Sequence, residues 1–169
     1  MPKIIENVRE QLLAEAKRQI EQNGYAKTTI RSVAGACDIA VGTVYNYFKS
    51  KEVLVGSFVL EAWREHLNTM KHLPSNDPKE LLGGIYASIN HFSKVNSRLF
   101  YDADAAKLIS EDFSKNHRIL RKQIAEFVFP VCDGDEFKAE FIAEAIICWS
   151  VEKEDFDRLY PLMEKIIKK

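Results

Sequence analysis

Apolar residues recur along most of this 169-residue chain every three or four positions, which is the repeat of an α-helix. In the first such segment, Ile5, Val8, Leu12, Ala16 and Ile20 fall on one side of a helix. Alternation of apolar and polar residues, the pattern of a half-buried strand, is scarce. We therefore predict an all-α protein.

Capping residues and helix breakers divide the chain into predicted helices. These helices cover approximately residues 4–23, 28–36, 41–48, 50–72, 78–95, 99–110, 111–129, 135–151 and 155–167. The clearest boundary is at Asp77, which is predicted to cap a helix that begins at Pro78. We expect residues 1–49 to form one small domain and residues 50–169 a larger helical domain, with a connecting helix from Ser50 to about His72.

Composition restricts the class of protein. The chain is 46% apolar and 29% charged, as in ordinary globular proteins. Its three cysteines are widely spaced, so we expect neither a disulfide framework nor a zinc site. We also expect no cofactor. No apolar run approaches the roughly 18 residues of a membrane span, and the charged first residues do not resemble a signal peptide. These features favour a cytoplasmic location.

Charge is unevenly distributed along the chain. Residues 1–51 contain eight Lys or Arg and five Asp or Glu, a net charge of +3. The remainder contains 16 Lys or Arg and 20 Asp or Glu, a net charge of −4. The basic part includes the sequence VGTVYNYFKSK, residues 41–51. A net charge of +3 is modest for a DNA-binding domain, so it leaves open a helical module without DNA recognition.

A helical projection of residues 41–48 separates two faces. The predicted core face carries Val41, Val44, Tyr45 and Phe48, and the opposite face carries Gly42, Thr43, Asn46 and Tyr47. A solvated face would more usually carry Glu, Lys and Gln, which are better helix formers. Lys51 then lies in the first turn of the next helix, where its charge opposes the helix dipole unless a phosphate is bound there.

Residues 29–51, TIRSVAGACDIAVGTVYNYFKSK, resemble the DNA-binding signature of the TetR family of bacterial transcriptional regulators. The resemblance lies in Val33-Ala34, Gly42-Thr43-Val44-Tyr45, Tyr47-Phe48 and Lys51-Glu52-x-Leu54, and it covers about the first third of the chain. Asp38 occupies the position of the family's usual turn glycine. Because Asp tolerates left-handed backbone better than most residues, we expect a strained turn there rather than a broken one. The resemblance implies an N-terminal three-helix helix-turn-helix domain followed by a helical-bundle domain for ligand binding and dimerisation.

The resemblance also implies which residues contact DNA. They are Thr29, Arg31, Gly42, Thr43, Tyr45, Asn46, Tyr47 and Lys51. Thr29 and Lys51 would bind phosphates, with hydroxyl donors from the tyrosines. Asn46 would face the major groove, where an amide can bond bidentately to adenine.

Two further sites are expected in the larger domain. The resemblance implies a homodimer through the last two helices, for which we select Phe141, Ala145, Trp149, Phe156, Leu159, Met163 and Ile167. Two faces buried inside one monomer would give the same pattern. A cavity for a small-molecule inducer is expected among Trp63, His66, Tyr86, Phe92 and Tyr101, although such residues are more often core.

The predicted function is a ligand-responsive transcriptional repressor that binds a palindromic operator as a homodimer and is released by a small-molecule inducer. The alternative is a helical dimeric interaction or ligand-binding module without specific DNA recognition. An enzyme is disfavoured, because the histidines and carboxylates lack the His-Glu-x-x-His spacing and no nucleophile or phosphate-loop motif is present.

Overall fold

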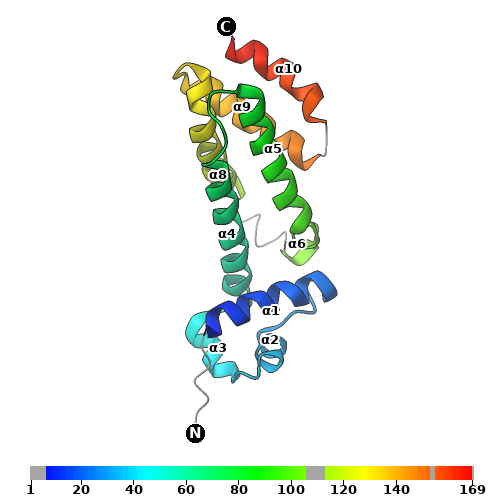
Figure 1. Ribbon diagram of the computed structural model, residues 1–169. Helices are drawn as coiled ribbons and strands as arrows, with labels where there is room; N and C mark the ends of the chain where they lie inside the picture. The colour runs from blue at the N-terminus through cyan, green and yellow to red at the C-terminus, as the bar shows by residue number, and fades with distance from the viewer. Residues whose placement is uncertain (1–6, 106–112, 153–154, 169) are drawn as a thin grey trace. The chain divides into compact units, whose positions relative to one another are not determined.

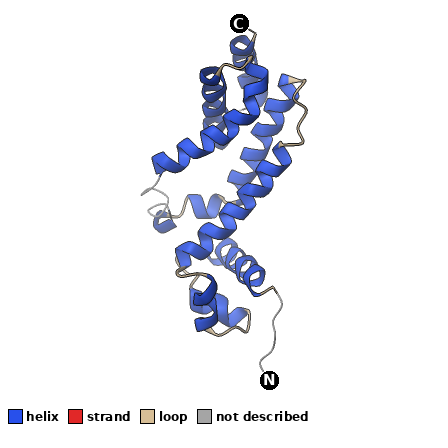
Figure 2. Cartoon of the chain, turned by 90° about the vertical axis from the view of Figure 1, so that its left-hand side faces the viewer, coloured by secondary structure: helices blue, strands red, loops and turns tan. Residues whose placement is uncertain are grey.

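The computed structural model describes residues 7–105, 113–152 and 155–168. Every regular element in these ranges is a helix (Figures 1 and 2). The helices are α1 (Val8–Asn23), α2 (Ile30–Ala36), α3 (Val41–Tyr47), α4 (Lys51–Met70), α5 (Pro78–Val95), α6 (Ser97–Phe100), α8 (Phe113–Val128), the 3-10 helix η1 (Phe129–Cys132), α9 (Glu136–Val151) and α10 (Phe156–Ile167). The prediction of an all-α protein is confirmed. None of these helices is long and apolar enough to cross a membrane.

Side-chain caps determine where several helices begin. Asp77 Oδ1 accepts hydrogen bonds from the N–H groups of Lys79 at 2.9 Å and Glu80 at 3.1 Å, so α5 begins at Pro78 as predicted. The carboxylate of Asp135 accepts a bond from a backbone N–H in the first turn of α9. A carboxylate in this position satisfies N–H groups that have no partner within the helix.

The segment after α5 is less helical than the sequence predicts. A single helix is expected over residues 99–110, but α6 ends at Phe100 after four residues. Asp102 Oδ1 then accepts bonds from the N–H groups of Asp104 at 3.0 Å and Ala105 at 3.1 Å. Its side chain thus begins a new helical turn instead of extending α6. The rest of the predicted helix lies outside the described residues.

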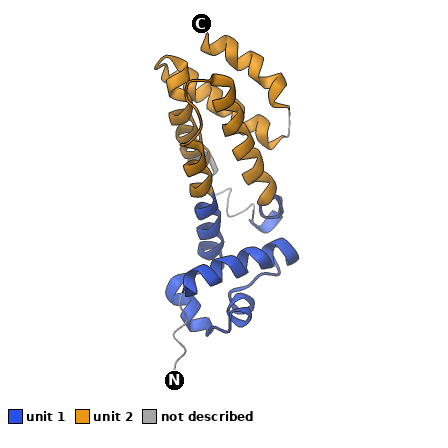
Figure 3. Cartoon of the chain, viewed as in Figure 1, with its two compact units in different colours: residues 1–62, 96–111 blue, residues 63–95, 112–169 orange. Residues whose placement is uncertain are grey.

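The chain forms two compact units (Figure 3). Unit 1 contains residues 1–62 and 96–111, and unit 2 contains residues 63–95 and 112–169. The chain therefore passes between the units three times. Helix α4 begins in unit 1 and ends in unit 2.

Unit 1 has its own apolar core. Leu12 of α1, Val33 of α2 and Val44 of α3 are completely buried in it. Leu99 of α6 and Ala105 belong to the same cluster, although they lie far from the first three helices in sequence. This core fixes the arrangement of α2 and α3.

Unit 2 is a bundle in which α9 packs against both α5 and α8. Its fully buried side chains include Leu82 and Ile85 of α5, Ile124 of α8, and Ile142 and Ile146 of α9. α9 is apolar around most of its circumference, so one side fills this core while other apolar side chains remain at the surface.

Candidate nucleic-acid interface

α2 and α3 are short helices joined by a tight turn. α2 begins with a reciprocal cap: Thr29 Oγ1 accepts from the Ser32 N–H, and Ser32 Oγ accepts from the Thr29 N–H, both at 3.0 Å. In the turn, Asp38 has φ 55°, the left-handed conformation expected at this position. The Ile39 N–H bonds back to the Ala34 carbonyl at 2.9 Å. These bonds fix the direction in which the chain enters α3.

The turn provides a first prediction. Asp38→Gly is expected to stabilise the protein by about 0.5 kcal/mol, because glycine adopts left-handed backbone without a steric cost from Cβ. Asp38→Ala is expected to destabilise it. Urea denaturation followed by circular dichroism measures both effects, and equal stability of the two variants would contradict the expectation.

α3 buries one face and exposes the other. Val44 is 0% exposed, and Phe48, the residue that follows α3, is 2% exposed. Both side chains pack in the core of unit 1. Asn46 and Tyr47 are exposed on the opposite face. A Cβ added to Gly42 would meet no atom within 4 Å, so internal packing does not require glycine there. The outward face of α3 is therefore the one that carries glycine and polar side chains.

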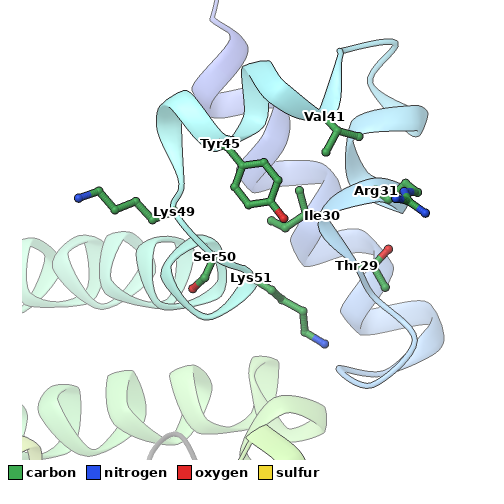
Figure 4. A pocket seen from close by; sticks show the side chains of 8 residues that line it. All are labelled: Thr29, Ile30, Arg31, Val41, Tyr45, Lys49, Ser50 and Lys51. Atoms are coloured by element: carbon green, nitrogen blue, oxygen red, sulfur yellow. The ribbon is translucent and has the colours of Figure 1, made fainter.

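Tyr45 is an exception to the projected core face. The prediction places it beside Val41, Val44 and Phe48, but its side chain is 51% exposed. It projects at the edge of that face, and a helix of two turns has too few neighbouring side chains to cover its edges. Tyr45 and Ile30 of α2 line the same pocket (Figure 4). Tyr45 is a surface residue, and its placement in the core was wrong.

An open groove of about 490 Å³ lies beside Tyr45 (Figure 4). We call it the cationic groove; it is lined by Thr29, Ile30, Arg31, Val41, Tyr45, Lys49, Ser50 and Lys51. Three of these side chains are cationic, three carry hydroxyl groups and none is acidic. Such a combination can bind the oxygens of a phosphate through charge and hydrogen bonds together.

The structure divides the predicted DNA-binding residues into two groups. Thr29, Arg31, Tyr45 and Lys51 line the cationic groove, whereas Gly42, Thr43, Asn46 and Tyr47 belong to α3 and do not line it. Sequence reasoning did not assign Ser50 to this surface. Its visible role is to cap α4, since Ser50 Oγ accepts from the Val53 N–H at 3.3 Å.

Lys51 has partners inside unit 1. Its Nζ donates to the carbonyl of Tyr25 at 2.7 Å and lies 3.6 Å from the centre of the Tyr25 ring. Burial lowers the pKa of Lys51, while the negative charges of Glu52, Asp102 and Asp104 act in the opposite direction. Lys51 therefore also has a structural role within unit 1. Because an ammonium has three N–H donors, its bond to Tyr25 leaves donors for a phosphate.

Tyr25 anchors this arrangement. Its side chain is 4% exposed, and its hydroxyl donates to Glu52 Oε1 at 3.3 Å. Burial, followed by the charge of Glu52, raises the pKa of Tyr25 to about 12. The tyrosine thus remains protonated at neutral pH and keeps the hydroxyl donor that binds Glu52.

Comparison with known proteins places these features in a family. Residues 12–57 match the model of bacterial regulatory proteins of the TetR family. The chain is 33% identical over 161 residues to the HTH-type transcriptional regulator HbdR of an Aromatoleum species, a match that covers 89% of this chain and 68% of HbdR. The chain belongs to the TetR family.

Other relatives match over shorter regions. The HTH-type transcriptional repressor KstR of Rhodococcus jostii is 28% identical over 111 residues, 62% of this chain and 52% of KstR. The HTH-type regulator YerO of Bacillus subtilis is 35% identical over 78 residues, 44% of this chain and 27% of YerO. The match thus spans about half of KstR and about a quarter of YerO.

Solved structures share this fold over most of the chain. A transcriptional regulator from Aquifex aeolicus aligns with a TM-score of 0.61 and 18% identity, covering 95% of each chain. A TetR-family regulator from Haemophilus influenzae aligns with a TM-score of 0.58 and 17% identity, covering 95% of this chain and 94% of the other. A helix-turn-helix domain followed by a helical domain, as expected from the resemblance, is therefore confirmed.

Three residues selected for an inducer site lie together in unit 2. The Phe92 ring packs edge to face against the rings of Trp63 and His66, with distances between ring centres of 5.2 Å and 5.5 Å. Trp63 Nε1 donates to Gln123 Oε1 at 2.9 Å, and His66 Nδ1 lies 2.8 Å from Ser88 Oγ. Gln123 and Ser88 had no distinctive sequence pattern and were missed. We call these five side chains the aromatic cluster.

The other two selected residues lie elsewhere. Tyr86 packs on Phe156 with ring centres 5.5 Å apart, and its hydroxyl donates to the Trp149 carbonyl at 3.4 Å. Tyr101 belongs to unit 1 and is 74% exposed. The structure therefore does not bring Tyr101 into the aromatic cluster.

The predicted interface residues also separate into two groups. On α9, Phe141 is 53% exposed and Trp149 42% exposed, with Ala145 between them in the same row. Phe137, one helical turn before Phe141, is 79% exposed and extends this row. We call these four side chains the α9 stripe. Their spacing of four residues places them on one side of the helix.

The residues selected on α10 face inward instead. Met163 and Ile167 are 2% and 9% exposed, and Phe156 and Leu159 pack against the same core of unit 2. The apolar pattern of α10 is thus satisfied within the monomer. Leu162, which was not selected, is 59% exposed.

Proposed function

We propose that this chain is a transcriptional repressor that binds a palindromic operator as a homodimer and releases it when a small-molecule inducer binds. The observation that carries the DNA-binding part is the polar outward face of α3 beside the cationic groove, with eight lining residues and no acid among them. The relative KstR is a transcriptional repressor, which favours repression over activation.

Each part of this proposal corresponds to a described surface. In the proposed division, residues 1–49 form the DNA-binding domain, assisted by Ser50 and Lys51 at the start of α4. The rest of residues 50–169 binds the inducer and the second subunit, and α4 connects the two parts. Phosphates would occupy the cationic groove, while Asn46 and Thr43 of α3 would meet base edges in the major groove. The aromatic cluster would contact the inducer, since apolar rings with a few polar atoms suit a small organic ligand.

Footprinting on DNA that flanks the protein's own gene tests the proposal. We expect protection of a twofold-symmetric site whose halves are about one helical turn, roughly 34 Å, or a multiple of that distance apart. Protection should disappear when the correct inducer is added. Failure to protect any DNA, even at low salt, would refute DNA recognition and favour the alternative of an interaction module.

Asn46 allows a sharper test of base recognition. Asn46→Ala is expected to lower affinity for the preferred operator by about 1–3 kcal/mol and to relax the preference at one base position in each half-site. Binding to unrelated DNA should stay unchanged, because the amide makes no phosphate contact in this arrangement. Selection of bound sequences from a random pool measures both properties, and an unchanged preference would exclude Asn46 as a base reader.

A further inference from the structure

Tyr25 contacts the ammonium of Lys51 in two ways. Its backbone carbonyl accepts a hydrogen bond from Lys51 Nζ at 2.7 Å, and the centre of its ring lies 3.6 Å from the same nitrogen. Tyr25 lies in the turn between α1 and α2, whereas Lys51 is the first residue of α4. The Lys51 ammonium is thus held in one place before any DNA binds.

Tyr25 is itself held by three further contacts. Its side chain is 4% exposed and packs in the core of unit 1. Its hydroxyl donates to Glu52 Oε1 at 3.3 Å, and its carbonyl also accepts from the Thr28 N–H at 3.1 Å. A ring packed in a dense core cannot move without disturbing its neighbours. Tyr25 therefore gives Lys51 a rigid support.

A rigid support matters for a lysine that binds phosphate. The long, flexible side chain of lysine loses conformational freedom when it is ordered at an interface, and this loss opposes binding. Lys51 has already lost part of that freedom when the protein folds, because its ammonium is bound to Tyr25. The Tyr25 carbonyl uses one N–H donor of the ammonium and leaves the others for a phosphate in the cationic groove.

We propose that Tyr25 is a positioning residue for DNA binding, whose ring and carbonyl hold the Lys51 ammonium at the cationic groove for a backbone phosphate. The inference rests on the proposed function, because it takes Lys51 as a phosphate ligand. At 4% exposure, Tyr25 has almost no surface with which to contact DNA itself. Its effect on DNA affinity must therefore pass through Lys51.

The test is Tyr25→Leu, which removes the ring and keeps the backbone carbonyl. Fluorescence anisotropy with a short DNA duplex of unrelated sequence, at low salt and well below the melting temperature, should show binding about three- to tenfold weaker than that of the parent. The slope of log K against log salt should not change, because the ammonium still displaces a counterion when it binds.

Two control variants separate the ring from the hydroxyl and from the core. Tyr25→Phe keeps the ring above which the ammonium lies, so it should restore the affinity of the parent. Phe58→Leu removes an aromatic ring from α4 in the same core and should also bind like the parent. A loss in Tyr25→Phe equal to that in Tyr25→Leu would overturn the role of the ring, and an equal loss in Phe58→Leu would show a general effect of the core.

A cycle with Lys51→Ala tests whether Tyr25 acts through Lys51. In the Lys51→Ala background, Tyr25→Leu should weaken binding no further, because the ammonium that the ring positions is absent. An equal further loss, or a shallower salt slope in Tyr25→Leu alone, would show that Tyr25 supports the whole DNA-binding surface instead. Parent-like binding by Tyr25→Leu would also overturn the inference.

A measurement on the parent protein serves if Tyr25→Leu does not fold. Protons that lie over an aromatic ring are shifted upfield in NMR spectra, so the ε-methylene protons of Lys51 should show this shift and keep it when DNA is added. Its absence, or its loss on binding, would overturn the inference. A parent that binds no DNA would refute the proposed function itself, whereas the other contrary outcomes refute only the role of Tyr25.

Discussion

Phe141→Glu is expected to convert the proposed homodimer into monomers. Phe141 lies within the α9 stripe and is 53% exposed in the isolated chain. In a twofold dimer, Phe141 of each subunit would be buried at the interface. Losing one central aromatic contact costs about 2 kcal/mol. Losing it in both subunits therefore raises the dimer dissociation constant about 1000-fold. Burying the new carboxylate adds to this cost. Sedimentation velocity at micromolar concentration measures the result.

A matched variant controls for the added charge. Leu60 is 48% exposed on α4 in unit 1, so Leu60→Glu makes the same kind of change at a similar exposure outside the α9 stripe. It should leave the protein dimeric. Loss of the dimer in both variants, or in neither, would show that the α9 stripe is not the interface. Operator binding should fall with the dimer, because one α3 reads only one half-site.

Lys51→Ala is expected to weaken binding to every DNA sequence by about tenfold in each half-site at low salt. The loss follows from one fewer charged contact to phosphate. The slope of log K against log salt should become shallower by about 0.9 for each subunit, because one fewer counterion is released there. Salt titrations of operator and unrelated DNA, followed by anisotropy, measure both quantities.

The structure adds a stability effect to this prediction. Lys51 also donates a hydrogen bond to the Tyr25 carbonyl, and its ammonium makes a cation–π contact with the Tyr25 ring. Lys51→Ala should therefore lower the melting temperature of the protein slightly. Affinity must therefore be measured well below that temperature. Lys122→Ala, an exposed lysine on α8 in unit 2, should change neither the affinity nor the salt slope. An unchanged slope for Lys51→Ala would remove Lys51 from the phosphate contacts.

Local chemistry explains which parts of the fold were predictable from sequence. The start of α5 depends on Asp77 and Pro78, and that of α2 on Thr29 and its neighbours, so both were visible in short stretches of sequence. The left-handed turn at Asp38 was likewise a local property. The opposite faces of α3 followed from the helical repeat, except at Tyr45, where exposure depends on which elements cover the edge of a short helix.

Long-range contacts account for what was missed. The hydrogen bond from Lys51 to the Tyr25 carbonyl joins residues 26 positions apart, so no local sequence pattern predicts it. An apolar stripe does not reveal its partner, so Met163 was expected at an interface although it fills the core of unit 2. Leu99 and Ala105 were not expected to complete the core of unit 1, because their burial depends on contacts with distant helices.

The inclusion of Leu99 and Ala105 in the core of unit 1 has a consequence for how such a protein can evolve. If the DNA-binding helices were a continuous N-terminal block, a single recombination event could join them to any ligand-binding bundle. Here the core of unit 1 also contains Leu99 and Ala105, which lie in sequence between two parts of unit 2. A hybrid that takes only the N-terminal helices would therefore lose part of this core, so it must exchange both segments together or repair the core where they meet.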